Sequence, residues 1–243
     1  MDTTSRKLEL AFAKKEQLTR DTFTFFFDRS KEQFDFHAGQ YFRLTIPIEN
    51  PDERGTSRYF TISSSPTDLD FLTITTKVIR SSFKLKLNSF QGGEKIIFFG
   101  PFGNMYQDEN DQTPKVFLAG GIGLTPSHSI LRFIDHQHLN VNFTLIVSFP
   151  FRNEVVFYDE LKEIEKRNPA VKIVYTLTKE ETLYPEFEKG RIDENMIKKY
   201  VQDYQHYKFF VVGPPLMAEA MFTLAISMGV EEGNITRENF TGY

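Results

Sequence analysis

The sequence predicts two domains: an antiparallel β-barrel over residues 1–110 and an α/β domain with a parallel sheet over residues 111–243. Through the first hundred residues, apolar and polar side chains alternate in short runs separated by turn signals, which is typical of antiparallel strands. From residue 116 onward, strand-like and helix-like runs alternate, which indicates a parallel sheet covered by helices. The polar segment 107–113 has no apolar periodicity, and it marks the boundary between the two patterns.

The runs of the first domain are short enough for strands and rich in aromatic and β-branched residues. Gly92 and Gly93 supply the turn before the last strand. One helical pattern interrupts the series over residues 82–90, and Ser82 is predicted to cap its N-terminus. The strands predicted for this domain cover residues 8–12, 22–27, 41–46, 71–78 and 95–99.

The second domain repeats the order strand, helix, strand, as a chain of parallel crossover units does. Its predicted strands cover residues 116–119, 141–149, 171–176 and 209–212. Its predicted helices cover residues 126–138, 154–166, 193–201 and 216–228.

Composition is that of an ordinary globular protein, with 40% hydrophobic and 26% charged residues, and no apolar run is long enough to span a bilayer. No signal-like segment follows Met1, so we expect a cytoplasmic protein. The chain has no cysteine, which excludes disulfides, thiolate catalysis and thiolate-bound zinc or iron–sulfur clusters. Any redox chemistry therefore needs an organic cofactor. A net charge of −4 argues weakly against nucleic-acid binding, and the scattered histidines predict no metal site.

The most informative motif is the glycine-rich turn at residues 119–126, Ala-Gly-Gly-Ile-Gly-Leu-Thr-Pro, which joins an apolar run to a helical pattern. A strand that ends in such a turn and opens a helix directs free N–H groups and the positive end of the helix dipole at a bound phosphate. The same glycines could equally make only a tight turn, because the spacing is not G-x-G-x-x-G.

Two further segments accompany this turn: residues 58–66, Arg-Tyr-Phe-Thr-Ile-Ser-Ser-Ser-Pro, and residues 212–217, Val-Gly-Pro-Pro-Leu-Met. In the order of these three segments the chain resembles the ferredoxin-NADP reductase superfamily over essentially its whole length. The resemblance implies a Greek-key barrel that binds FAD, followed by a Rossmann-like domain that binds NADH or NADPH.

By this resemblance Arg58 pairs with the FAD pyrophosphate, and Thr61 lies near flavin N5, the atom that accepts hydride. Phe60 stands where the family usually has tyrosine, so a stacking face is kept and a phenolic hydrogen bond is lost. The alternatives are a surface arginine beside a strand and, for Ser82, plain helix capping. The FAD contacts implied for the barrel are Arg58, Tyr59, Phe60, Thr61, Thr75, Thr76, Lys77, Ser81, Ser82, Phe83 and Lys84.

In the second domain the resemblance places the nicotinamide nucleotide on the two glycine loops, with Val212 where many relatives have cysteine. Relatives that bind NADPH commonly have Ser-x-Arg after the second strand. This chain has Ser148 followed by Pro150, with Arg152 two residues late, so the sequence favours NADH slightly. The implied contacts are Gly121, Ile122, Gly123, Thr125, Pro126, Ser148, Arg152, Gly213, Pro214, Pro215 and Met217.

The C-terminal residues carry two further hypotheses. By resemblance Tyr243 stacks on the flavin and leaves when nicotinamide enters, with Gly242 as its hinge. The alternative is a frayed chain end. Glu238 is interpreted as a proton relay or, about equally, as an exposed acid.

These residues together predict an FAD-dependent NAD(P)H oxidoreductase that passes electrons to a separate acceptor such as ferredoxin or flavodoxin. Reduction of free flavin, a quinone or an oxygenase component is the alternative enzymatic interpretation, and a flavin-holding subunit of a larger complex is the non-enzymatic one. An acidic carrier would need a basic docking patch, for which the candidates are Arg29, Lys31, Arg80, Lys84 and Lys86.

Overall fold

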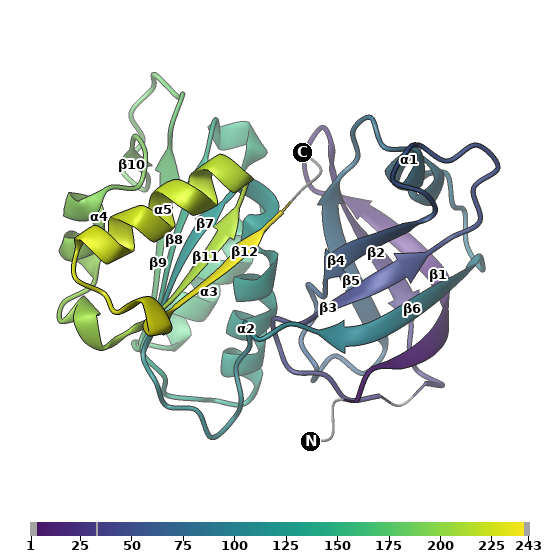
Figure 1. Ribbon diagram of the computed structural model, residues 1–243, viewed down its shortest axis with the longest axis horizontal. Helices are drawn as coiled ribbons and strands as arrows, with labels where there is room; N and C mark the ends of the chain where they lie inside the picture. Colours follow the sequence, from purple (N-terminus) through teal and green to yellow (C-terminus); the bar gives the residue numbers. More distant parts are fainter. Residues whose placement is uncertain (1–3, 33, 241–243) are drawn as a thin grey trace. The chain divides into compact units, whose positions relative to one another are not determined.

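The computed structural model describes residues 4–32 and 34–240, which Figure 1 shows as a ribbon. The chain divides into two compact units. The first, here the barrel domain, holds residues up to 108 together with 128–133. The second, here the sheet domain, holds residues 109–127 and the described chain from 134 onward.

The barrel domain is a single curled sheet of six antiparallel strands. The strands are β1 (Arg6–Gln17), β2 (Thr22–Asp28), β3 (Tyr41–Thr45), β4 (Ser57–Thr61), β5 (Phe71–Lys77) and β6 (Lys95–Phe102). Their order in the sheet is β4-β3-β6-β1-β2-β5. A bridge between Ile62 and Ile74 joins the end of β4 to β5, so the two edges of the sheet meet and the predicted barrel is confirmed.

Phenylalanine fills the barrel interior. Phe27 and Phe42 are fully buried, and both pack edge-on against the buried ring of Phe98, with centroid separations of 5.0 and 5.9 Å. Burying each such side chain contributes about 1.5–3 kcal/mol, and edge-on ring contacts add to it. The alternation of the sequence therefore places one hydrophobic face of the strands, rich in phenylalanine, inside the barrel.

The barrel helix, α1 (Ser82–Asn88), has a cap that differs from the prediction. Ser81 is extended, and its side chain accepts a hydrogen bond from the Lys84 N–H, so Ser81 is the N-cap. Ser82 is the first helical residue, and the prediction that it caps the helix is wrong by one position.

The sheet domain has six parallel strands in the order β10-β9-β8-β7-β11-β12. They are β7 (Lys115–Gly120), β8 (Phe143–Phe149), β9 (Val171–Leu177), β10 (Glu188–Lys189), β11 (Lys208–Gly213) and β12 (Ile235–Asn239). The helices are α3 (Tyr158–Arg167), α4 (Glu194–Tyr200), α5 (Pro215–Ser227) and the two ends of α2 (Thr125–His136), whose residues 128–133 belong to the barrel domain. The predicted alternation of strand and helix is confirmed.

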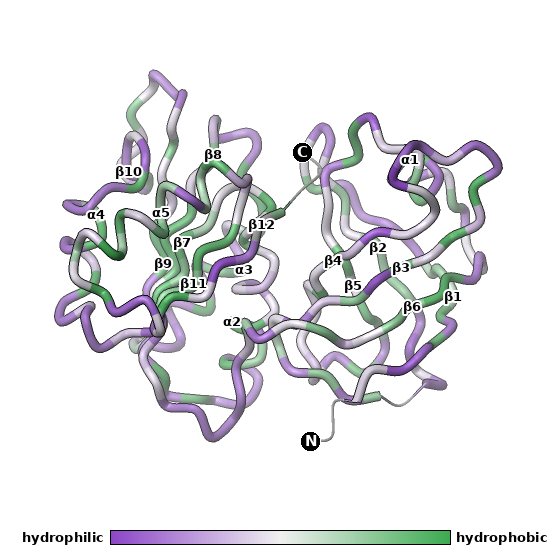
Figure 2. Tube along the Cα trace, in the orientation of Figure 1, coloured by the Kyte–Doolittle hydropathy of each residue, from purple (hydrophilic) through white to green (hydrophobic). Residues whose placement is uncertain are grey.

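The central strands of the sheet domain are rich in hydrophobic residues, as their green colour in Figure 2 shows. On one face Val116 and Leu118 of β7 share a core with α4 and α5. On the other face Phe117 packs against the rings of Phe143 and Phe210, at 5.0 and 4.7 Å between centroids. Such two-sided burial is what a parallel sheet covered by helices requires.

A buried ion pair lies at the start of β7. Lys115 has no exposed side-chain surface, and its ammonium group lies 2.9 Å from an Asp111 carboxylate oxygen and 3.0 Å from the Thr113 carbonyl oxygen. Burial alone would raise the Asp111 pKa, but hydrogen bonds from Thr113 and Lys115 outweigh it and lower the pKa to about 2. This segment was predicted only as a polar boundary.

Within the barrel domain, residues 128–133 from the middle of α2 contact the chain after β4. The His128 ring Nδ1 lies 2.8 Å from the Ser63 carbonyl oxygen, and the Ser129 hydroxyl donates to the Ser64 carbonyl oxygen at 2.6 Å. Arg132 donates to both carboxylate oxygens of Asp68. In the part of the chain that the structure describes, no helix combines the length and the apolar content needed to cross a bilayer.

Candidate functional site

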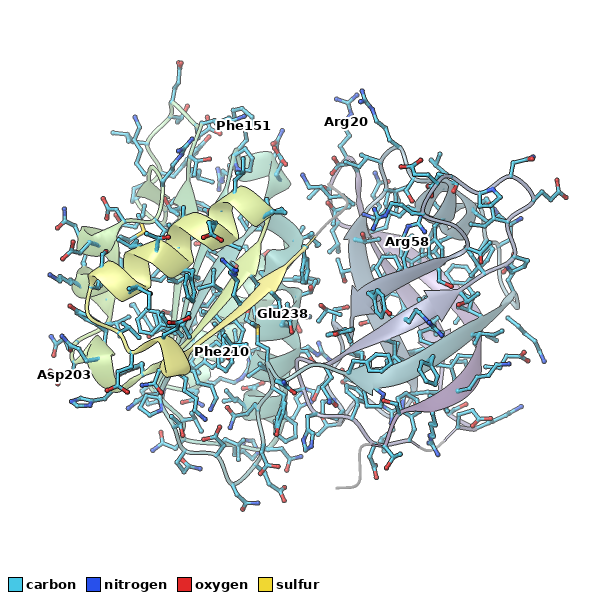
Figure 3. The ribbon with its side chains drawn as sticks, viewed as in Figure 1. Arg20, Arg58, Phe151, Asp203, Phe210 and Glu238 are labelled. Atoms are coloured by element: carbon cyan, nitrogen blue, oxygen red, sulfur yellow. The ribbon has the colours of Figure 1, made fainter. Side chains whose placement is uncertain are left out.

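The first candidate site surrounds Arg58 on β4, a side chain that is only 5% exposed and is labelled in Figure 3. One terminal nitrogen donates to the carbonyl oxygens of Arg54, Gly55 and Ser57 at 2.8–2.9 Å. The other terminal nitrogen donates to the Asp52 carboxylate. The guanidinium carbon lies 5.7 Å from the centre of the Phe83 ring. Arg58 is therefore held firmly inside the barrel domain rather than lying free on its surface.

Asp52 links Arg58 to the start of α1. One carboxylate oxygen accepts from Arg58 and from the Arg54 backbone N–H, and the other accepts from the Ser82 backbone N–H at 3.1 Å. The Asp52 backbone N–H donates in return to the Ser82 hydroxyl at 3.0 Å. Burial opposes ionisation, yet these hydrogen bonds lower the Asp52 pKa to about 2.

Lys84 completes this group of charges. Burial, together with the positive charges of Arg54 and Arg58, lowers the Lys84 pKa to about 8. Three cations and one carboxylate leave a net charge of about +2 when Lys84 is protonated. Arg58 Nε is also buried, without a hydrogen-bond partner among the described residues. A site with surplus positive charge and an unused buried donor fits a phosphate group, and a pyrophosphate bears one negative charge on each phosphate.

The other predicted FAD contacts lie on two sides of the barrel wall. Phe60 is 9% exposed and packs on the fully buried Phe83, at 5.6 Å between ring centres, whereas Tyr59 points outward and is 63% exposed. The remaining residues of this group are Thr61, Thr75 and Thr76, which are buried, and Lys77 and Ser81, which are half-buried.

Thr75 belongs to a buried network of hydroxyl groups. Its oxygen lies 2.9 Å from that of Thr24 and 2.9 Å from that of Ser63, which in turn lies 2.8 Å from the Thr73 hydroxyl. The structure thus gathers Arg58, Ser82 and Lys84 in one place and directs Thr75 to a different one. The FAD roles of all these residues stay predictions.

The second candidate site is the point where the parallel sheet changes direction. β7 and β11 are neighbours, but the chain leaves β7 toward β8 on one side and leaves β11 toward β12 on the other. Open α/β sheets bind ligands at the carboxyl ends of the strands at such a switch point. The two predicted glycine loops follow these two strands, so the structure brings them together.

The contact between the two loops leaves no room for side chains. A Cβ on Gly123 would lie 2.6 Å from the Val212 carbonyl oxygen and 3.1 Å from the Gly213 Cα. A Cβ on Gly120 would overlap the Met217 sulfur. Gly121 instead has φ +53° with open space around its Cβ position, so its glycine is needed for the turn itself.

The loop after β7 passes through a 3₁₀ turn (Gly121–Leu124) directly into α2. The Thr125 hydroxyl donates to the Ile122 carbonyl oxygen at 3.1 Å, and Ile122, Thr125 and Pro126 are buried. After β11, Pro214 precedes α5 and Pro215 is its first residue, a position where the missing N–H of proline costs nothing. The Ser148 hydroxyl donates to the Ala119 carbonyl oxygen at 3.5 Å.

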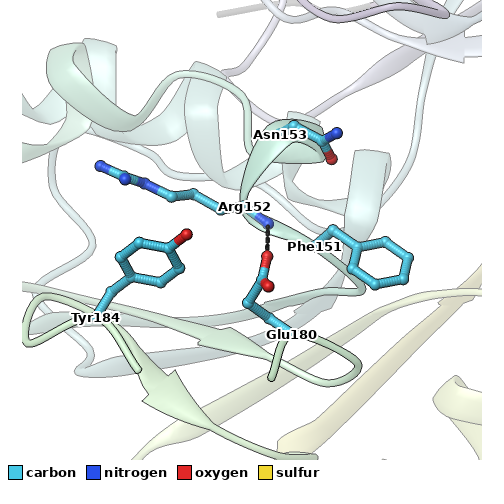
Figure 4. A pocket seen from close by; sticks show the side chains of 5 residues that line it. All are labelled: Phe151, Arg152, Asn153, Glu180 and Tyr184. Atoms are coloured by element: carbon cyan, nitrogen blue, oxygen red, sulfur yellow. Dashed lines mark hydrogen bonds between the residues drawn. The ribbon is translucent and has the colours of Figure 1, made fainter. Parts of the chain in front are cut away.

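A pocket opens beyond the ends of β8 and β9, with a volume of about 480 Å³ (Figure 4). Its lining residues are Phe151, Arg152, Asn153, Glu180 and Tyr184. The Arg152 guanidinium lies 4.5 Å from the Tyr184 ring centre and 3.3 Å from a Glu186 carboxylate oxygen. The Arg152 backbone N–H donates to Glu180 at 3.4 Å. The pocket thus offers aromatic surface and two carboxylates around one arginine.

Glu238 on β12 pairs in register with Val212 on β11 (Figure 3). Its side chain is neither fully buried nor exposed, and burial raises its pKa to about 7. The interpretation of Glu238 as an ordinary exposed acid is therefore wrong. Beyond it, the Phe240 backbone N–H donates to the Gly213 carbonyl oxygen at 3.0 Å, so the strand ends at the loop after β11. The predicted stacking residue Tyr243 and its hinge Gly242 lie outside the described residues.

Sequence reasoning missed the acidic residues near Arg58 and near Arg152. Asp52, Glu180 and Glu186 take their roles from partners that lie up to 34 residues away along the chain. The one available signal was Asp52 beside Pro51, because proline and aspartate are common in turns. In the predicted docking patch, Lys31, Arg80 and Lys86 are exposed, but Arg29 is only 4% exposed, so its inclusion is wrong.

Two family models match the chain. A model of the oxidoreductase FAD-binding domain matches residues 9–106, and a model of the oxidoreductase NAD-binding domain matches residues 117–222. Together they cover most of the barrel domain and of the sheet domain.

Individual relatives are distant in sequence. The chain is 26% identical over 212 residues to a glycine betaine monooxygenase reductase subunit of Chromohalobacter salexigens, covering 85% of this chain and 56% of that protein. It is 24% identical over 215 residues to a flavohemoprotein of Dictyostelium discoideum, covering 83% of this chain and 52% of that protein. The chain thus spans about half the length of these relatives.

Solved structures share the fold. The Amycolatopsis cytochrome P450 reductase GcoB matches with a TM-score of 0.84 and 22% identity, over 99% of this chain and 71% of that one. A ferredoxin NADP⁺ reductase from Neisseria gonorrhoeae, with bound FAD and NADP, matches with a TM-score of 0.78 and 22% identity, over 96% of this chain and 98% of that one.

Replacing Gly123 by alanine tests the switch point. The new Cβ, 2.6 Å from the Val212 carbonyl oxygen, forces the ends of β7 and β11 apart. We expect the free energy of unfolding to fall by about 1–3 kcal/mol, as overpacking usually costs. The KM for the reduced nicotinamide nucleotide should rise. Gly233→Ala is the control, because its Cβ would meet nothing within 4 Å. Wild-type stability and KM in the Gly123 variant would contradict this account.

Replacing Glu238 by glutamine tests its burial. A carboxyl whose pKa is about 7 in the folded chain and near 4.5 when unfolded destabilises the fold as pH rises from 4.5 to 7, and the cost stays constant above 7. At pH 8.5 we expect Glu238→Gln to be more stable than wild type in urea unfolding by up to about 3 kcal/mol. The difference should shrink toward pH 5. A difference independent of pH would show that Glu238 is not desolvated.

Proposed function

Since the chain belongs to the ferredoxin-NADP reductase superfamily, we propose that it is an FAD-dependent NADH oxidoreductase that passes electrons to an acceptor outside these 243 residues. FAD supplies the chemistry when bound, because it accepts hydride from a reduced nicotinamide and releases electrons one or two at a time. The observation that carries the proposal is the glycine contact at the switch point between β7 and β11.

In the barrel domain, Arg58, Ser82 and Lys84 would hold the FAD pyrophosphate. Arg58 offers a buried N–H without a partner among the described residues, and Lys84 offers an ammonium group whose proton is held less tightly than usual. An added anion favours the charged form of Lys84, so phosphate binding relieves the mutual repulsion of the three cations. Phe60 and Phe83 would supply apolar contact beside this group, and Thr61 would lie near the reacting end of the flavin.

In the sheet domain, the loops after β7 and β11 would hold the nicotinamide nucleotide. Their glycines bring two backbones close enough for N–H groups to approach a phosphate without interference from a Cβ. Met217 fills the space beside Gly120 and Gly213, which fixes the start of α5. Positioning of this kind accounts for a large share of catalysis in reactions that join two bound partners. Glu238 would exchange a proton near Val212.

The need for a separate electron acceptor follows from the absence of cysteine in these residues. No cysteine is present, so these residues cannot hold an iron–sulfur cluster through thiolates, and the electrons must leave to another group. A ferredoxin, a flavodoxin or an oxygenase component would serve. A relative that is a monooxygenase reductase subunit supports the oxygenase alternative, and the exposed cations Lys31, Arg80 and Lys86 support an acidic carrier.

The test of this function is direct. Purified protein, stripped of flavin and then supplied with FAD, should regain flavin absorbance and oxidise NADH with ferricyanide as acceptor. Protein that takes up no FAD would overturn the proposal. Protein that binds FAD without oxidising NADH would be a flavin-holding subunit instead. Reduced enzyme titrated with ferredoxin, flavodoxin and oxygenase components then distinguishes the acceptors by their rates of reduction.

The pocket at Arg152 favours NADH over NADPH. Glu186 already neutralises the Arg152 guanidinium, and Glu180 lies on its backbone N–H, so the added 2′-phosphate of NADPH would meet two carboxylates. We expect a higher kcat/KM for NADH, and Glu180→Gln should raise the NADPH value several-fold, since it removes one like charge. Glu181→Gln, an exposed neighbour outside the pocket, is the control. A strong NADPH preference that disappears in Arg152→Ala would contradict this assignment.

A further inference from the structure

One carboxylate occupies two of the donors that a phosphate at this site would use. Asp52 accepts from the Arg58 guanidinium through one oxygen and from the Ser82 backbone N–H through the other. Arg58 and Ser82 are the residues assigned above to the FAD pyrophosphate. The partners come from β4 and α1, and the carboxylate comes from the turn that precedes β4. Asp52 therefore bridges two elements in the manner of a bound oxyanion.

Most of the donors of Arg58 are engaged within the chain. One terminal nitrogen is shared among three carbonyl oxygens of the segment 54–57, and the other is engaged by Asp52. Of the guanidinium nitrogens only Nε is without a partner among the described residues, and that atom is buried. A pyrophosphate oxygen that approaches the terminal nitrogen bound to Asp52 competes with that carboxylate for the same part of the guanidinium, because two anions held side by side repel each other.

Burial makes this contact strong. Arg58 is 5% exposed and the Asp52 side chain 22%, so solvent screens the pair weakly. The groups that face the Asp52 carboxylate are Arg58, the Ser82 amide and the Arg54 amide, and Lys84 adds positive charge nearby. The depressed Asp52 pKa agrees with this geometry, because it shows that the ionised carboxylate is well stabilised where it lies.

We propose that Asp52 is an affinity-determining residue of the FAD site, an internal anion that competes with the FAD pyrophosphate for Arg58 and the Ser82 amide. The inference rests on the proposed function, because it takes FAD as the ligand. Asp52 stabilises the flavin-free barrel domain and lowers its affinity for FAD. Once displaced, the carboxylate lies beside a phosphate and repels it, which opposes retention of the cofactor.

Asp52→Asn keeps the shape and removes the charge. For this variant, stripped of flavin, we expect a lower melting temperature than wild type and an FAD dissociation constant that is roughly tenfold smaller, as the loss of one competing charge-assisted hydrogen bond implies. The dissociation constant is measured by quenching of flavin fluorescence. ADP, which carries a pyrophosphate without a flavin, should also bind more tightly to the variant.

Asp111→Asn is the matched control. Asp111 also has a pKa of about 2 and also pairs with a buried cation, but it lies in the sheet domain. This variant should lose stability without a change in FAD affinity. It therefore shows whether lower stability by itself alters FAD affinity, as distinct from removal of a competing carboxylate. Should Asp52→Asn fail to fold, Asp52→Ser keeps an acceptor for the Ser82 amide, and carboxyl NMR of the wild type reports directly whether FAD shifts the Asp52 resonance.

The outcomes separate the inference from the function on which it rests. Wild-type protein that takes up no FAD ends the proposed function. Wild-type protein that binds FAD, together with an Asp52→Asn variant that folds and binds FAD equally or more weakly, overturns the role of Asp52. An Asp52 resonance that FAD leaves unmoved overturns it as well. Tighter binding of both FAD and ADP by the variant supports it.

Discussion

The backbone contact between the ends of β7 and β11 is the constraint on which the sheet domain depends. The carbonyl group of Val212 and the Cα of Gly213 lie against Gly123 in the turn after β7, so a side chain at Gly123 would collide with the end of β11. The same point fixes three further elements: α2 begins beyond Gly123, α5 begins beyond Gly213, and the Phe240 amide binds the Gly213 carbonyl oxygen at the end of β12. Only glycine permits this close approach, because it has no Cβ. The geometry of the candidate nicotinamide site therefore depends on the absence of side chains at these positions.

The barrel domain is organised on a different principle, the need to satisfy a buried charge. Arg58 cannot be withdrawn from water without acceptors, and the segment 54–57 supplies three carbonyl oxygens while Asp52 supplies a carboxylate. Arg58 therefore shapes the turn that precedes its own strand and, through Asp52, the start of α1. Steric exclusion fixes the candidate nicotinamide site and charge compensation fixes the candidate FAD site, so substitutions of Gly123 should act through packing and substitutions of Asp52 through electrostatics.

The sequence predicted the elements whose signal is local. Alternation marked most barrel strands, and continuous apolar runs marked the central parallel strands. It missed β12, whose Ile-Thr-Arg-Glu-Asn reads as a polar tail because it lies at the sheet edge and pairs only with β11. The predicted helix cap was wrong by one residue because positions 81 and 82 are both serine, and either could cap the helix. Arg29 looked exposed because its partners, the Phe34 carbonyl oxygen and two phenylalanine rings, follow it in a segment without regular structure. Contacts of this kind form only in the folded chain, so they cannot be read from the types of neighbouring residues alone.

The site at Arg58 and the pocket at Arg152 each pair an arginine with a carboxylate of the chain, and burial decides how much each pair matters. Arg152 and Glu186 have side chains that are 53% and 36% exposed, so water and salt screen their attraction, and an incoming phosphate could separate them at little cost. Discrimination there must come from repulsion between the carboxylates and the phosphate rather than from occupation of the arginine. Arg58 is nearly enclosed, so separating it from the Asp52 carboxylate or from a bound phosphate costs free energy in either case. An arginine–carboxylate pair thus discriminates only weakly against a phosphate where it is exposed, as at Arg152. Where it is buried, as at Arg58, its carboxylate competes with the phosphate for the arginine.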